Sequence, residues 1–401
     1  MPTLDARTVR IYRVILLLGC TAFFVLQWIN GRDGMADFRV YHDAAEAWMA
    51  GESPYSQWFF VETGYYKYSP VMLVPFMPLT WLPVKVASSL FYFAIVVAMA
   101  WLLPRVVQRA KALFPYGGTP GWLLLAVLSA VMLDHLVHEL HLGNTNLLLL
   151  GLGWSMFVHV RRGKWKWAGV AYACMLLAKP HFLILMPWLV MRKEFRVLGT
   201  TTLGVMIGLL LPALWTGWGE NLTLLQDWYL AIREHQSMLP SANTWASMSA
   251  GVIGVELPAP TWLFASTVAL AAAAIFFLLR HHGLPQTDHR RAYVEFFLLI
   301  SLIPNLTNTD TEHFLWSIPV LAGLLVMLPW SQGKRWLWAI LGVAALPWLL
   351  STPDLIGHAA DEWLDKSGLI GVSNTFLLGW FVWYVLRPPA HLPDPAMHVP
   401  V

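Results

Sequence analysis

The chain has 401 residues, of which 57% are hydrophobic and only 12% are charged, and its mean hydropathy is +0.56. A water-soluble protein carries about 25% charged residues, so this composition excludes a soluble globular fold and predicts an integral membrane protein. The formal net charge of +3 is too small to indicate a nucleic-acid-binding protein.

Long apolar stretches recur along the chain from its N-terminus. A bilayer core about 30 Å thick needs roughly 20 apolar residues of helix, and each stretch approaches that length. Polar segments separate one stretch from the next, which predicts a polytopic, all-α arrangement. The expected spans lie near residues 11–29, 84–104, 121–134, 145–160, 197–215, 258–279, 291–305, 314–330, 335–351 and 369–386.

A further apolar stretch, Trp167–Met191, is interrupted by Lys179 and Pro180. Proline removes a backbone donor and clashes with the preceding turn, so this stretch is expected to form two short helices that meet at the break. With them the chain has about twelve membrane segments, some short or broken, in a single domain of residues 1–401.

The basic residues orient these segments, because cytoplasmic loops are enriched in lysine and arginine. Placing the N-terminus in the cytoplasm puts most of the 26 basic residues on the inner side. Both termini are then cytoplasmic, and residues 30–83 and 216–257 form the two large outer segments. Most carboxylates fall on the same outer side. We therefore expect a multi-pass protein of the inner (plasma) membrane whose active site faces the periplasm or exterior.

The first outer segment places Asp33 and Asp37 directly after the first span. A carboxylate within reach of a bound hydroxyl can take its proton and act as a general base. The same carboxylate can equally be a solvated loop residue or a helix cap. The spacing alone leaves both interpretations of Asp37 open.

A series of short motifs follows one order along the chain. The motifs are Ala36–Tyr41, Ala50–Tyr55, Tyr68–Pro70, Gly143–Leu148, Ala178–Pro180 and His235–Ser237. This series resembles glycosyltransferase family 87, and the resemblance spans residues 36 to about 320. Members of that family are GT-C enzymes that use polyprenyl-phosphate sugars, among them the alpha-mannosyltransferases of phosphatidylinositol mannoside assembly. The chain differs from the family at Asn144, where Gln is usual, and at His313, the one histidine that stands where the family has a pair.

The resemblance implies a GT-C fold with amphipathic helices on the outer face, and a hexosyltransferase that works with inversion. In the GT-C pattern an acidic residue of the first outer loop is the catalytic base, and Asp37 is the residue at that position. The expected reaction moves a hexose, most simply mannose, from a polyprenyl-phosphate donor to a lipid or glycan acceptor. No nucleotide sugar and no nucleic acid take part.

Lys179 needs a partner, because a lysine at membrane depth costs about 2.5–3.5 kcal/mol unless it is paired or faces a polar cavity. We expect it to bind the phosphate of the lipid-linked donor, as fixed positive charge stabilises a leaving phosphate. A snorkelling lysine and an ion pair with an outer carboxylate are the alternatives. The remaining residues expected to contact substrate are Arg39, Tyr68, Asn144, His235, Gln236, Glu312 and His313.

His135, His138 and Glu139 share one helix face, but their spacing is not that of a known zinc motif. No cofactor and no metal site are therefore expected, although a divalent metal stays open because some GT-C enzymes use one. The rival function is a polytopic transporter or lipid flippase, which would show an inverted repeat that this sequence lacks. A non-catalytic scaffold is a third possibility, and it would tolerate the loss of Asp37.

Overall fold

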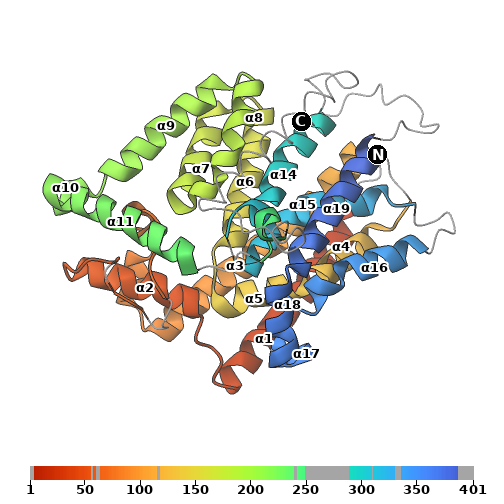
Figure 1. Ribbon diagram of the computed structural model, residues 1–401, viewed down its shortest axis with the longest axis horizontal. Helices are drawn as coiled ribbons and strands as arrows, with labels where there is room; N and C mark the ends of the chain where they lie inside the picture. The colour runs from red at the N-terminus through yellow and green to blue at the C-terminus, as the bar shows by residue number, and fades with distance from the viewer. Residues whose placement is uncertain are drawn as a thin grey trace. The chain divides into compact units, whose positions relative to one another are not determined.

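The computed structural model describes residues 4–55, 57–59, 64–114, 118–238, 242–248, 289–308, 310–329 and 336–386. These residues form helices joined by turns and extended segments, with no β-strand among them (Figure 1). The span expected near 258–279 lies outside the described residues. The chain divides into two compact units, and each is described by itself. Unit 1 comprises Met1–Leu16, Ala100–Leu136 and Pro240–Val401, and unit 2 comprises Leu17–Met99 and Val137–Leu239.

Within the described ranges, four helical segments are long and apolar enough to cross a membrane. They are α1 (Ala6–Ile29), α3 (Val84–Leu113), the segment Phe195–Thr216 and α19 (Leu369–Leu386). A fifth crossing is formed if α4 (Gly121–Val131) and α5 (Leu133–Leu142), bent by 61°, are one broken span. These helices fit a polytopic membrane protein, and the count of about twelve segments stays a prediction.

Unit 2 contains a layer of packed helices. Helix α7 (Trp165–Ala178) packs against α6 (Asn146–Arg161) and α9 (Phe195–Leu210), and the three lie side by side in Figure 1. Small residues bring α7 and α9 close together: a Cβ on Gly169 would lie 2.5 Å from Cβ of Thr200. Close backbone approach at small residues is typical of helix packing in membranes.

The predicted break at Lys179 is present. Helix α7 ends at Ala178, Lys179 is extended (φ −136°, ψ 105°), and the chain continues as a 3-10 helix, η3 (Pro180–Leu185), and then α8 (Met186–Met191). The carbonyl of Leu177, near the end of α7, accepts a hydrogen bond from the amide of Ser69 at 3.1 Å. A backbone group at the break is thus satisfied by another segment, as membrane-embedded irregular backbone requires.

Unit 2 also contains α2 (Ala36–Met49), η1 (Pro70–Leu73), η2 (Met77–Trp81), α10 (Ala213–Thr216) and α11 (Trp218–Met238), together with parts of α1, α3 and α5. Helix α2 packs on η1 and η2, and η1 also contacts α7, α9 and α11. The amphipathic pattern of α2 explains its placement, since one face buries Phe38, Tyr41 and Ala45.

Unit 1 contains parts of α1, α3 and α5. Its complete helices among the described residues are α4, α14 (His289–Leu306), η5 (Thr311–Ser317), α15 (Ile318–Met327), α16 (Trp336–Leu349), α17 (Pro353–Ile356), α18 (His358–Ser367) and α19. Its buried centre carries a polar network rather than apolar side chains alone. The amide of Asn374 donates to the carbonyl of Ser301 at 2.9 Å and to Oδ1 of Asn305 at 2.6 Å. Hydrogen bonds of this kind hold helices together where no water is available.

Candidate active site

Asp37 lies in the first turn of α2, where the amides of a helix N-terminus favour a negative charge. The turn between α5 and α6 reaches this point because of Gly143, whose φ of +68° is a left-handed conformation that glycine adopts readily. A Cβ on Gly143 would lie 2.6 Å from Cε of Met35 and 2.9 Å from Cβ of Phe38. The glycine therefore allows the turn to press directly on the start of α2.

Asn144, the next residue of this turn, contacts the candidate base. Its Nδ2 donates a hydrogen bond to Oδ2 of Asp37 at 2.6 Å. Its Oδ1 accepts a hydrogen bond from the backbone amide of Thr145 at 2.7 Å, which fixes the amide with its NH₂ group towards the carboxylate. Asn144 is buried and Asp37 is partly exposed. The carboxylate is thus held in one orientation while part of it can still meet a substrate.

Tyr68 lies in the same unit, within a chain of buried hydroxyl groups. Its Oη is 3.0 Å from Oη of Tyr41 and 2.8 Å from Oγ1 of Thr145. Burial raises the pKa of both Tyr41 and Tyr68 well above the ordinary value for tyrosine. Both hydroxyls therefore stay neutral and act as hydrogen-bonding groups rather than as acids.

Lys179 is buried, with only 8% of its surface exposed, so it does not snorkel to the membrane surface. Its Nζ donates to Oδ1 of Asn146 at 2.6 Å and lies 5.9 Å from the centroid of the Tyr68 ring. Nδ2 of Asn146 donates to Oε2 of Glu139 at 3.2 Å, and Oε1 of Glu139 accepts from the amide of Leu147 at 2.7 Å. The ammonium and the Glu139 carboxylate interact electrostatically.

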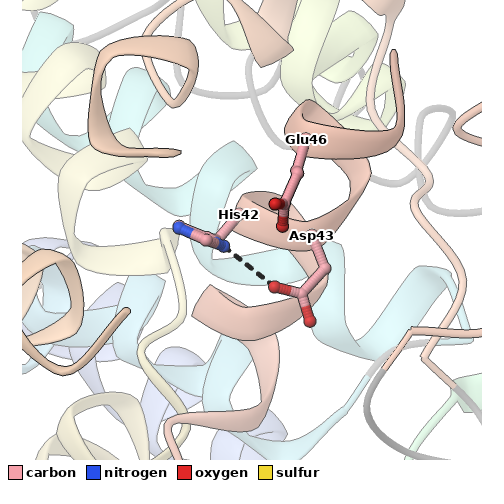
Figure 2. A group of neighbouring side chains, drawn as sticks. All are labelled: His42, Asp43 and Glu46. Atoms are coloured by element: carbon pink, nitrogen blue, oxygen red, sulfur yellow. Dashed lines mark hydrogen bonds and ion pairs between the residues drawn. The ribbon is translucent and has the colours of Figure 1, made fainter. Parts of the chain in front are cut away.

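His42, Asp43 and Glu46 form a second polar group on α2 (Figure 2), and Arg39 of the same helix pairs with Asp43. Nη2 of Arg39 lies 3.4 Å from Oδ2 of Asp43, and Oδ1 of Asp43 lies 2.8 Å from Nδ1 of His42. His42, Asp43 and Glu46 each offer an atom that could bind a metal ion, and these atoms lie within 4.8 Å of one another. The positive charge of Arg39, paired with Asp43, disfavours a second cation at this carboxylate.

Glu312 and His313 belong to unit 1, where both are buried at the start of η5. Ligand atoms of these two residues and of Asp310 lie within 4.8 Å of one another. The His313 ring packs edge-on against Trp316, with centroids 4.7 Å apart. His135, expected on a helix face with Glu139, is stacked on Phe314 within the same unit.

Four of the predicted residues, Asp37, Tyr68, Asn144 and Lys179, are gathered in unit 2 around the Gly143–Leu147 turn. His235 and Gln236 lie in α11, and their side chains are outside the described residues. Sequence reasoning missed the part played by Glu139. The sequence did contain an indication of this role. A carboxylate within an apolar helix is costly unless it is paired, and the same argument holds for Lys179.

The unit thus holds an oriented carboxylate and a buried ammonium beside one turn, a combination that can take a proton from a hydroxyl and bind an anion. A model of glycosyltransferase family 87 matches residues 66–306 of the chain. The matched region includes Tyr68, Asn144 and Lys179. No match was found among curated protein sequences.

Proposed function

Because the chain belongs to glycosyltransferase family 87, we propose that it moves a hexose, mannose, from a polyprenyl-phosphate donor to a hydroxyl group of a lipid or glycan acceptor. The family makes it a membrane-embedded glycosyltransferase with a sugar donor and an acceptor as substrates. We further propose that the donor is a polyprenyl phosphate, that the sugar is mannose, that the reaction inverts the anomeric centre and that the site faces the outer side.

The hydrogen bond between Asn144 and Asp37 carries this proposal. A carboxylate fixed by one amide and by a helix N-terminus is suited to general base catalysis, since its other oxygen keeps a defined direction. In the proposed reaction, Asp37 takes the proton of the acceptor hydroxyl. The hydroxyl oxygen attacks the anomeric carbon from the face opposite the phosphate. The bond between that carbon and the phosphate oxygen breaks, and polyprenyl phosphate leaves with the electron pair.

Lys179 is proposed to stabilise the negative charge of the leaving phosphate. Its ammonium is buried at the broken helix, where a charge acts in low dielectric and is already oriented by Asn146. Arg39, Tyr68, His235, Gln236, Glu312 and His313 stay candidates for contact with sugar, phosphate or acceptor. Neither a cofactor nor a metal ion is part of this proposal.

The test uses purified protein in liposomes with radiolabelled polyprenyl-phosphate mannose and a lipid extract of the host. Asp37→Asn is compared with Asp33→Asn, which makes the same change in the same outer segment at a carboxylate that pairs with Lys85. We expect transfer by the wild type and by Asp33→Asn, and a loss of about 100-fold or more in Asp37→Asn. Equal transfer by all three proteins would remove Asp37 from the mechanism. Transfer from another polyprenyl-phosphate hexose alone would overturn the assignment of mannose.

A further inference from the structure

Glu139 is a fully buried carboxylate to which the proposed reaction gives no role. Its two oxygens serve different partners. Oε1 accepts the amide of Leu147, in the first turn of α6, and Oε2 accepts the side-chain amide of Asn146. Burying a charge is expensive unless it is paired and fully hydrogen-bonded, so a carboxylate kept in this place is expected to serve a purpose.

The two asparagines of the turn are oriented in opposite senses. Asn144 turns its NH₂ group towards the carboxylate of Asp37, whereas Asn146 turns its carbonyl oxygen towards the ammonium of Lys179. Each orientation has its own cause. The amide of Thr145 fixes Asn144, and the carboxylate of Glu139 fixes Asn146 because only an NH₂ group can donate to it.

We propose that Glu139 is a positioning residue for anion binding: through Asn146 it orients and balances the ammonium of Lys179. The role in anion binding rests on the proposed function. The orientation itself does not, because it follows from the hydrogen-bonding capacity of the three side chains.

A substitution of Glu139 by glutamine shows why the orientation depends on the carboxylate. Glutamine has the same shape but offers one acceptor and one NH₂ group. In one orientation of the introduced glutamine, its NH₂ group faces the NH₂ group of Asn146. In the other orientation, its NH₂ group faces the backbone N–H of Leu147. In both cases two donors meet. Rotating Asn146 to relieve the first conflict would point its NH₂ group at Lys179. Every arrangement leaves a donor against a donor, and the compensating charge is lost as well.

A second substitution removes the conflict. In the double variant Glu139→Gln/Asn146→Asp, the NH₂ group of the introduced glutamine donates to one oxygen of the introduced aspartate, and its carbonyl accepts the amide of Leu147. The other aspartate oxygen accepts from Lys179. The negative charge moves by one side chain, while three hydrogen bonds corresponding to the described ones and the net charge are kept. Asn146→Asp alone would place two carboxylates beside each other, so we expect both single variants to be worse than the double variant.

The experiment measures the melting temperature in detergent and the transfer kinetics in liposomes for the four proteins of this cycle, with Glu52→Gln, an exposed site of the same unit, as the control. We expect both single variants to melt at lower temperature than the wild type, and kcat/KM for the donor to fall at least tenfold in each. The double variant should melt within a few degrees of the wild type and recover transfer to within about threefold. The control should match the wild type in both measurements.

The two readouts keep this inference separate from the proposed function. If Glu139→Gln melted at the same temperature as the wild type, the hydrogen-bond network would be wrong. The same conclusion would follow if the double variant melted no higher than the less stable single variant. Recovered melting temperature without recovered transfer, in an active wild type, would overturn the positioning role. The wild type could also fail to transfer mannose while the double variant melts at the wild-type temperature. That result would overturn the proposed donor and support the hydrogen-bond network. Single variants too unstable to purify, beside a double variant that folds, would also support it.

Discussion

Asn144 donates a hydrogen bond of 2.6 Å to Asp37, a residue 107 positions earlier in the chain. The contact joins the first turn of α2 to the turn between α5 and α6, and Gly143 makes room for it. A hydrogen bond to a charged partner is shorter and stronger than one between neutral groups. The orientation of the candidate base therefore depends on a residue of a distant segment.

Replacing Asn144 by leucine, which has a similar size, removes this hydrogen bond. We expect kcat for sugar transfer to fall about 10- to 100-fold with little change in KM, because a hydrogen bond to a charged group contributes about 1.5–3 kcal/mol. Steady-state kinetics in liposomes measures both constants. Ser53→Ala, which removes a hydrogen bond to Asp227 in the same unit, serves as the control. Unchanged kcat in Asn144→Leu would show that Asp37 needs no such orientation.

Replacing Lys179 by methionine separates stability from activity. We expect Lys179→Met to lower the melting temperature, because it leaves the buried Glu139 carboxylate without a compensating charge. Adding Glu139→Gln should raise the melting temperature again. Transfer should stay low in both variants, since neither has an ammonium for the leaving phosphate. Recovery of transfer in the double variant would exclude Lys179 as a phosphate ligand.

Gly143→Ala and Gly163→Ala form a matched pair that tests the contact with Met35. Both glycines have a left-handed φ, +68° and +66°, but a Cβ at Gly163 would meet no atom within 4 Å. We expect Gly163→Ala to cost about 1 kcal/mol of unfolding free energy through the backbone alone. Gly143→Ala should cost about 1–3 kcal/mol more, because the added methyl group collides with Met35 and Phe38. Denaturant unfolding in mild detergent measures both, and equal costs would contradict the close approach.

Asp365 in α18 predicts a pH dependence of stability in unit 1. Burial and, to a smaller extent, the nearby Asp361 raise the pKa of this carboxyl from 3.8 to about 6. Asp134 also interacts electrostatically with both carboxylates. Between these two pKa values the unfolded chain has lost the proton that the folded chain keeps, so stability falls as pH rises through this window.

We therefore expect Asp365→Asn to melt a few degrees above the wild type at about pH 7, and no higher than the wild type at about pH 4. Melting curves at the two pH values, with Asp33→Asn as the control, measure the difference. A stabilisation of the same size at both pH values would show that the carboxyl is not titrating in this range.

Local sequence patterns predicted those features that depend on neighbouring residues. Pro180 predicted the break after α7, because the ring of a proline acts on the turn directly before it. The ion pair between Arg39 and Asp43 has the i, i+4 spacing that predicts contact on a helix, although only the structure identifies it. The membrane class followed from composition alone.

No local sequence pattern predicted which residues of the candidate site contact one another. Asp37 and Asn144 were each selected through the family resemblance, but nothing in either segment indicates that one contacts the other. Glu139 was grouped with His135 and His138 because helical periodicity places them on one face. In the structure its partners come from the next helix, since the turn after α5 brings Asn146 and Leu147 back onto the carboxylate. Periodicity describes a single helix and cannot predict where the chain folds back.

The opposite senses of Asn144 and Asn146 make the register of this short turn as important as its residue types. One extra residue between the two asparagines would lengthen the turn, so Asn144 and Asn146 would no longer reach Asp37 and Lys179 at the same time. Such a chain would keep every residue of the site and would change only the spacing inside the Gly143–Leu148 motif. Its loss of activity would be invisible to a comparison of residue types, so related sequences are better judged by the spacing from Gly143 to Leu147 than by the presence of the asparagines.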